Sequence, residues 1–197
     1  DTYEFFTDDS VYNYVNTFYK EFDAKTSDLW DTINEKGTTM NDVVILASFI
    51  QEEAGMPAED AKVSACFHNR LESDDPQWAE HKLESNASSY IMNDSDNNYL
   101  WNSPTAAYYG WPEQGAIPDD VLAHYDTYRI SGLPAGPISN PGYAAIEAAL
   151  NPDQEYLDEG YYFFVTGHPD TDVAGQYFYA KTADEHYQNC VKAGWEN

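Results

Sequence analysis

The chain has 197 residues, with 35 Asp and Glu against nine Lys and Arg, and a formal net charge of −26. Nucleic acids and anionic lipid surfaces both require a basic footprint, so this charge argues against either as a binding partner. The acidic residues are spread along the chain without a long block, which indicates a solvated surface rather than a cationic partner. A hydrophobic content of 42% supplies a sizeable core, and the length fits one domain, with at most a small appendage.

The sequence contains no apolar run long enough to span a bilayer and no signal peptide. It opens directly on DTYEFF, so we expect a domain trimmed from a longer protein. The two cysteines, Cys66 and Cys190, leave two possibilities open, a disulfide or two buried thiols.

Helical periodicity dominates the first part of the chain. Residues 8–36 follow a helical spacing, with Asp8 to Ser10 as candidate caps and Gly37 as the end. A second helix is predicted over residues 41–54 and stops at Gly55. A third begins at Pro57, which suits a first helical turn, and runs to about residue 71.

The second half of the chain is less regular. Residues 73–123 carry turn chemistry, for which we expect short helices and a short strand pair. Residues 125–142 contain three Gly and three Pro and predict a rigid segment, after which Asn140 is expected to cap a helix over 141–150. Residues 161–166 and 176–180 predict a β-hairpin, and Thr182 with Glu185 predicts a capping box for a helix through 192. The expected fold is α+β, mainly helical, with a small antiparallel β-sheet.

One carboxylate stands on the apolar face of the helix predicted over residues 41–54. At about 100° per residue, Val43, Leu46, Phe49 and Ile50 share a face, and Glu53 falls in the middle of it. Apolar faces turn inward, so the carboxyl should meet the core or a cleft, where it needs a partner or must keep its proton. A partly desolvated Glu that keeps its proton suits a general acid. Periodicity alone leaves open a Glu in the last turn that reaches water.

Other chemistries find little support in the sequence. Asp94, Asp96 and Asn98 have the spacing of a calcium loop, but Tyr99 replaces its glycine and Thr105 its bidentate Glu. The five His residues show no zinc-ligand spacing, and GxSxG, Walker and GxGxxG motifs are absent. We therefore expect no metal and no cofactor.

The order of motifs resembles that of the YceG-like family of endolytic murein transglycosylases. The opening DTYEF and the segment LASFIQEEAG are similar to the family's PDTYEF and LASIVEKETG. KVSACFHNRL resembles KVAxVFxNRL, and YDTYRISGLPAGPISNPGYAAIEAALNP resembles YNTYxxxGLPPGPIxNPGxxxIxAAxxP. Near the end, YYFFV and FYAKTADEHYQN resemble YFV and FxxTxxEHN. The resemblance runs in order over nearly the whole chain, and GLPxGPIxNPG is its most specific part.

This resemblance implies a lysozyme-like catalytic core in a membrane-anchored enzyme at the extracytoplasmic face of the cell membrane. Such an enzyme cuts peptidoglycan glycan strands internally, between N-acetylmuramic acid and N-acetylglucosamine, and leaves 1,6-anhydro ends. The family's catalytic glutamate corresponds to Glu53, the residue that periodicity also singles out. Residues 1–197 are then one catalytic domain, with 1–40 as a helical lead-in and 41–197 as the core. The membrane anchor and a LysM-like part would lie outside this chain, and cell wall synthases are expected partners besides peptidoglycan.

The resemblance also suggests substrate-binding residues in four motifs. They are Asn69 and Arg70 of NRL, Glu84 and Asn86 of the segment matching LQSDPT, Tyr125 and Tyr128 of YNTY, and Gly136, Ile138 and Asn140 of GPIxNPG. A structural role stays open for each of them, because a rigid loop needs its own glycines and caps. Arg70, for example, could equally form a structural ion pair.

The chain departs from the family pattern at two places near these residues. Gln51 and Glu52 replace the first Glu and the Lys of EKE, and Asn86 and Ala87 replace the Asp and Pro of LQSDPT. Two alternative functions therefore remain. One is a muramidase-type hydrolase, in which Asp126 or Glu84 would help a water molecule attack. The other is a catalytically silent peptidoglycan-binding module.

Overall fold

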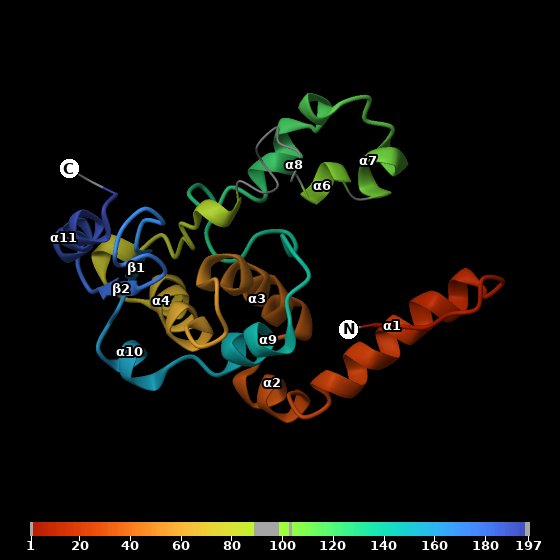
Figure 1. Cartoon of the computed structure of the whole chain (residues 1–197), viewed down its shortest axis with the longest axis horizontal. Coiled ribbons are helices and arrows are strands. Elements are labelled where there is room, and N and C mark those ends of the chain that lie inside the picture. Colours follow the sequence, from red (N-terminus) through yellow and green to blue (C-terminus); the bar gives the residue numbers. More distant parts are fainter. Residues whose placement is uncertain (1, 89–98, 103, 196–197) are drawn as a thin grey trace. The chain divides into compact units, whose positions relative to one another are not determined.

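The computed structural model describes the chain except for residues 1, 89–98, 103 and 196–197 (Figure 1). It divides into two compact units, Asp1–Met40 and Asn41–Asn197. The candidate calcium-loop residues Asp94, Asp96 and Asn98 lie outside the described residues.

The first unit contains two helices, α1 (Val11–Thr26) and α2 (Trp30–Lys36). The cap predicted among residues 8–10 is Ser10, whose hydroxyl accepts the Asn13 N–H, and Gly37 ends α2 with a left-handed φ of 67°. The prediction of one continuous helix over residues 8–36 is wrong. The Thr26 hydroxyl donates a hydrogen bond to the Phe22 carbonyl oxygen, and the Ser27 hydroxyl donates to that of Ala24. Such side-chain bonds to the backbone of the preceding turn compete with continuation of the helix.

The second unit is mainly helical. Its α-helices are α3 (Met40–Ala54), α4 (Asp60–Glu72), α6 (Tyr99–Asn102), α7 (Pro104–Tyr109), α8 (Asp119–Ala123), α9 (Tyr143–Leu150), α10 (Gln154–Asp158) and α11 (Ala183–Ala193). Its described residues also form three 3₁₀ turns, η1 (Pro76–Trp78), η2 (Asn86–Ser88) and η3 (Gln114–Ala116), and two strands, β1 (Phe163–Thr166) and β2 (Tyr177–Ala180). The strands pair antiparallel, with Phe163 opposite Ala180. The predicted α+β class, mainly helical with a small antiparallel sheet, is confirmed.

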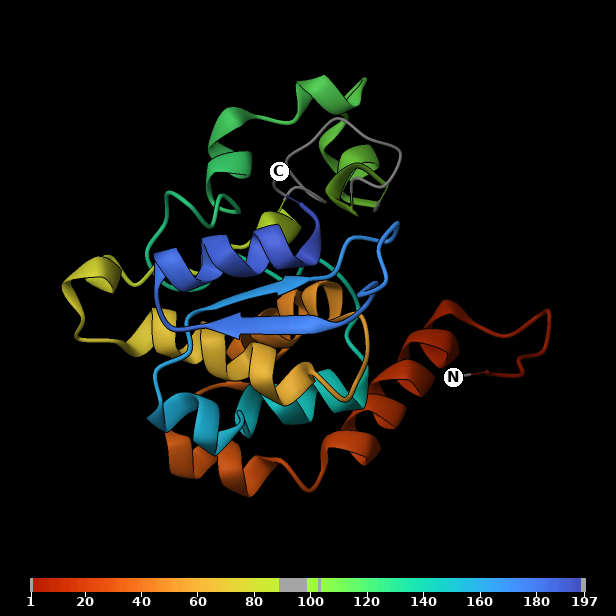
Figure 2. The ribbon, with the colours of Figure 1, turned by 60° about the vertical axis from the view of Figure 1, so that its left-hand side comes forward.

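Helix α3 forms the centre of this unit. Every residue from Ile45 to Ile50 is buried, as are Val43 and Ala54. Helix α4 packs against α9, where the Ser64 hydroxyl donates to the Ala148 carbonyl oxygen at 2.7 Å. The β1–β2 hairpin lies between α4 on one face and α11 on the other (Figure 2). Each fully buried aliphatic or aromatic side chain in such a core contributes about 1.5–3 kcal/mol.

Several helix boundaries differ from prediction for local reasons. Helix α4 begins at Asp60 rather than Pro57, because residues 56–60 form successive tight turns. Asn140 does not cap α9, which begins at Tyr143 after the N-cap residue Gly142. The Gly142 N–H donates to the side-chain oxygen of Gln51 at 3.0 Å, and this bond accompanies an extended backbone at Gly142. The described residues of 73–123 contain no strand pair, and α10 was not predicted.

The two cysteines are both thiols. Cys66 is fully buried on α4, and its burial raises the pKa of the thiol to about 12. Cys190 on α11 is half-buried, with its Sγ 3.7 Å from Nε2 of His186.

No helix in the described part of the chain combines the length and apolar character that crossing a membrane requires. Within the same residues, no group of three His, Cys, Asp or Glu side chains is arranged to hold a metal ion.

Candidate active site

Glu53 lies in the last turn of α3, where its side chain is half-buried. Its Oε1 atom accepts two hydrogen bonds, from the Ser85 hydroxyl at 2.5 Å and from the Ala87 N–H at 3.2 Å. Its backbone carbonyl oxygen accepts a third, from the Tyr177 phenol at 3.0 Å. Across the described residues, Oε2 makes no hydrogen bond with the protein. The described residues therefore hold the carboxyl at one oxygen, Oε1.

A buried hydroxyl network supports the segment that reaches Glu53. Thr127 is fully buried, and its Oγ1 donates to the Ser85 carbonyl oxygen at 2.9 Å while accepting the Ser85 N–H at 3.0 Å. The Ser88 hydroxyl donates to the same carbonyl oxygen at 2.9 Å. The Ala87 N–H is shared with Oγ of Ser85 at 3.1 Å. These bonds fix the backbone of residues 85–88 and so the two donors to Glu53.

Arg70 of α4 holds residues 83 and 84, which directly precede Ser85. Its guanidinium donates to the carbonyl oxygens of Leu83 and Glu84, at 2.8 and 3.1 Å, and to that of Tyr162 at 2.7 Å. Arg70 is only 7% exposed. Among the described residues it forms no ion pair, which the sequence had left open as a structural role. Burial lowers the pKa of Arg70, and electrostatic interactions with Cys66, Glu84 and Glu53 partly oppose that effect. Arg70 therefore acts within the protein, holding the residues that precede Ser85.

Tyr128 and Asn86 lie at the exposed edge of this site. The Tyr128 hydroxyl donates to Oδ1 of Asn86 at 2.9 Å, and the Tyr128 side chain is 46% exposed. The pKa of Tyr128 is raised, first by burial and then by Glu53, Glu84 and Asp126, whereas Arg70 lowers it. The structure thus brings four of the predicted residues, Arg70, Glu84, Asn86 and Tyr128, close to Glu53 or to its supporting segment.

The segment 132–142 lies along α3 and is held by side chains of that helix. The buried Ser48 hydroxyl accepts the Ile138 N–H at 3.0 Å, and Ile138 is itself 2% exposed. Gly136 is buried against Tyr125, and a Cβ added there would lie 2.9 Å from the Tyr125 phenolic oxygen. The predicted residues Tyr125, Gly136 and Ile138 therefore shape the packing of this segment, and the Ile138 amide is already used by α3.

Two predicted residues have other surroundings. Asn69 donates its amide hydrogens to the carbonyl oxygens of Tyr156 and Tyr161, at 3.1 and 2.9 Å, and so joins α4 to the chain before β1. Asn140 is exposed and does not cap α9. No hydrogen bond among the described residues links the side chain of Asn69 or Asn140 to Glu53.

The residues that contact Glu53 most directly were missing from the predicted site. They are Ser85, Ala87 and Tyr177, with Thr127 supporting Ser85. A signal for two of them was present, because Ser85 stands at the Ser of LQSDPT and Thr127 at the Thr of YNTY. The prediction instead named the two tyrosines of YNTY and the neighbours of Ser85, Glu84 and Asn86. For Tyr177 the sequence offered no signal beyond its strand.

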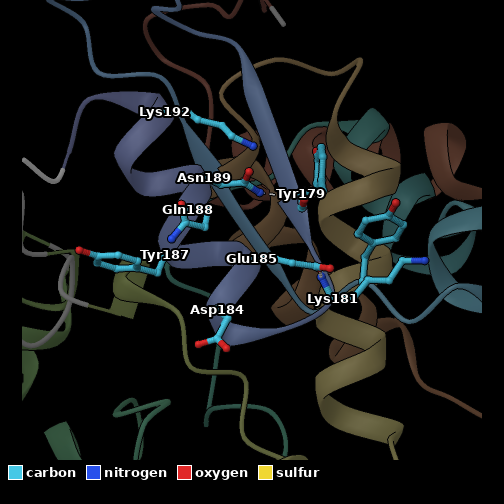
Figure 3. Close-up of a pocket in the computed structure, with 9 residues that line it drawn as sticks. Tyr179, Lys181, Asp184, Glu185, Tyr187, Gln188, Asn189 and Lys192 are labelled. Atoms are coloured by element: carbon cyan, nitrogen blue, oxygen red, sulfur yellow. Dashed lines mark hydrogen bonds between the residues drawn. The ribbon is translucent and has the colours of Figure 1, made fainter.

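A cavity of about 750 Å³ lies elsewhere, against α11 and the end of β2 (Figure 3). Its lining includes Tyr179, Lys181, Asp184, Asn189 and Lys192, and none of its lining residues contacts the Glu53 carboxyl. We place the candidate active site at Glu53 because the buried hydrogen-bond network converges there. A cavity lined mainly by exposed side chains of one helix offers no comparable set of fixed polar groups.

Among the described residues, the candidate site is thus a carboxyl on a helix, held at Oε1 within a mainly helical α+β scaffold. Residues 1–192 match the model of the YceG-like family, and the chain belongs to that family. A solved structure of a YceG-like protein from Listeria monocytogenes shares the fold, with a TM-score of 0.65 at 23% identity. That alignment covers 94% of this chain and 51% of the Listeria chain.

Curated relatives carry the name endolytic murein transglycosylase. The protein of Streptococcus pneumoniae serotype 2 (strain D39 / NCTC 7466) is 27% identical over 194 residues, which is 97% of this chain and 30% of the relative. The protein of Bacillus subtilis (strain 168) is 26% identical over 187 residues, covering 91% of this chain and 42% of the relative. The chain therefore spans less than half the length of these relatives.

Proposed function

We propose that this chain is the catalytic part of an endolytic lytic transglycosylase that acts on peptidoglycan, with Glu53 as its acid and base. The observation that carries the proposal is the Glu53 carboxyl, half-buried and held at Oε1 by Ser85 and Ala87. Membership of the YceG-like family and the names of the relatives support the substrate. Peptidoglycan lies outside the cell membrane, so the protein would work at its extracytoplasmic face, where cell wall synthases are candidate partners.

In the first step, protonated Glu53 gives its proton to the glycosidic oxygen between N-acetylmuramic acid and N-acetylglucosamine. The bond from that oxygen to the muramyl C1 breaks, and the sugar passes through an oxocarbenium-like state. Glu53 becomes a carboxylate, and its negative charge is favoured by two hydrogen-bond donors at Oε1 and by the buried cation of Arg70.

In the second step, the Glu53 carboxylate takes the proton of the muramyl 6-hydroxyl group. The oxygen of that hydroxyl forms a bond to C1 and closes the 1,6-anhydro ring, which returns Glu53 to its protonated form. One carboxyl thus serves both steps, and no water molecule is consumed. This balance suits a site in which one carboxyl, rather than a matched pair, is held by a rigid network.

The substrate would approach along the exposed edge marked by Tyr128 and Asn86. The Tyr128 ring offers a face on which a sugar can pack, and Asn86 offers an amide group. Residues 41–197 would form the catalytic unit, with the two helices of residues 1–40 as a lead-in.

The decisive experiment compares the parent chain with Glu53→Gln on purified sacculi. The substitution keeps the size of the side chain but removes its transferable proton, so soluble anhydro-muropeptides should fall by about 10²- to 10⁴-fold while the circular dichroism spectrum is unchanged. Retention of activity by Glu53→Gln would show that another residue is the acid.

Mass spectrometry of the products tests the alternatives. A muramidase-type hydrolase leaves a reducing end, which is heavier by one water than an anhydro end. Asp126 is a weak candidate to activate that water, because its Oδ1 already accepts the Tyr128 N–H at 3.1 Å. A silent binding module would hold sacculi without releasing any soluble product.

A further inference from the structure

The two hydrogen bonds that the described residues donate to the Glu53 side chain end on the same oxygen, Oε1. One comes from the Ser85 hydroxyl and the other from the Ala87 backbone N–H. A backbone N–H can only donate, so Oε1 must present a lone pair to it whether Glu53 is charged or neutral. A proton on the Glu53 carboxyl is therefore expected on Oε2.

These two hydrogen-bond donors belong to buried residues of the protein. Ser85 is 2% exposed, and Ala87 is 5% exposed. Thr127 holds the Ser85 backbone through two hydrogen bonds, and Arg70 holds the residues just before it. Water cannot readily replace either donor, because both lie in the buried wall of the site.

We propose that the Ser85 hydroxyl and the Ala87 N–H act as positioning groups that clamp Oε1, so that Oε2 gives the proton to the glycan and later takes one back. This inference rests on the proposed function and adds to it the choice of the reacting oxygen. The clamp also favours the carboxylate over the acid, since a fixed donor binds a charged oxygen more strongly than a neutral one. It therefore assists the second step, in which Glu53 must act as a base.

The Ala87 N–H is a feature of this particular chain. The family pattern LQSDPT has proline at this position, and proline has no backbone N–H to donate. Ala87→Pro thus removes one donor and leaves the Ser85 hydroxyl in place. Ala87→Gly is the control, because it also changes the side chain at this position but keeps the N–H.

The other groups that act on Glu53 remain the same in both variants. Arg70 of α4, Tyr128 and Tyr177 of β2 each interact electrostatically with Glu53, and Glu84 and Asp126 act on Tyr128 beside it. A difference between the proline and glycine variants therefore reports on the Ala87 N–H, which donates to Oε1 of Glu53 and is shared with Oγ of Ser85.

The test measures two quantities in the 197-residue chain carrying Ala87→Pro or Ala87→Gly. The first is the pH dependence of anhydro-muropeptide release, and the second is the NMR titration of the ¹³C-labelled Glu53 carboxyl, assigned by its loss in Glu53→Gln. Without the donor, Glu53 keeps its proton to higher pH. Both the alkaline limb of activity and the titration midpoint should then lie about 0.5–1 pH unit higher in the proline variant.

Equal midpoints in the two variants would overturn the clamp. If Ala87→Pro does not fold, Ser85→Ala removes the other donor, and its midpoint should rise relative to the parent chain. An unchanged midpoint in Ser85→Ala would likewise overturn it. The NMR titration needs no turnover, so the clamp can be judged even if Glu53→Gln keeps activity and the proposed function fails.

Discussion

Tyr177 of β2 donates its phenolic hydrogen to the backbone carbonyl oxygen of Glu53 across 3.0 Å. The last carbonyl groups of a helix lack partners within it, and this bond satisfies one of them at the end of α3. Gly55 follows with a φ of 57°, and a Cβ added there would lie 3.0 Å from the Tyr177 phenolic oxygen. The hairpin and the turn after α3 thus fit closely beside the candidate acid.

Tyr177→Phe should remove this bond with little change in packing. We expect the free energy of unfolding to fall by about 1 kcal/mol, with a several-fold drop in kcat as the last turn of α3 loosens. Urea unfolding and the rate of sacculus digestion measure the two effects. Tyr187→Phe, at a tyrosine that is 54% exposed, is the control. Equal unfolding free energies for the two variants would contradict a stabilising role for the bond.

Thr127→Val should be more damaging. Valine has a similar shape but no hydroxyl, so the buried Ser85 N–H loses its acceptor, at a cost of about 1–3 kcal/mol. The displaced Ser85 should then lower activity more than Tyr177→Phe does. Thr127→Ser keeps the hydroxyl and should recover most of the activity. A serine variant as impaired as the valine variant would point to lost packing instead.

Arg70→Lys should destabilise the fold by about 2 kcal/mol or more, because lysine cannot reproduce the planar contacts with three carbonyl oxygens. These contacts are buried and involve no carboxylate among the described residues, so added salt should leave the difference nearly unchanged. Arg129→Lys is the control, since the Arg129 side chain is 77% exposed. Thermal and urea unfolding at low and high salt provide the measurement.

The stability of the chain should decline in alkali through Cys66. Burial raises the pKa of this thiol from 9.0 to about 12, and Arg70 has a smaller opposite effect. Below pH 9 the thiol is protonated in both the folded and the unfolded chain, so the free energy of unfolding does not depend on pH through Cys66 there. Above pH 9 the unfolded chain loses this proton first, and stability should fall by about 1.4 kcal/mol per pH unit until the pH nears 12.

Cys66→Ala should make that alkaline decline less steep, although its stability at neutral pH is lower because of the lost side chain. Urea unfolding between pH 8 and the alkaline limit of the fold gives the slope, with Cys190→Ala as control. The same slope in Cys66→Ala and the parent chain would mean that the thiol ionises equally easily in both states.

Local patterns in the sequence accounted for the scaffold. The apolar spacing from Val43 to Ile50 placed α3, and Gly55 and Thr182 marked a helix end and a helix start, because periodicity and capping depend on residues within one or two turns. The sequence did not predict the end of α1 at Thr26 or the start of α9 at Tyr143. The α9 boundary involves Gln51, a residue 91 positions away in the chain.

The position of Glu53 on the inner side of α3 was determined by the sequence itself, since helical spacing alone brings it into line with Phe49 and Ile50. Which groups hold its carboxyl was decided only by the tertiary structure. Ser85 and Ala87 lie 32 and 34 residues further along, and Thr127 another 42 residues beyond Ser85. Their hydrogen bonds depend on how separate loops pack against one helix, and no periodicity within any of these segments encodes that packing.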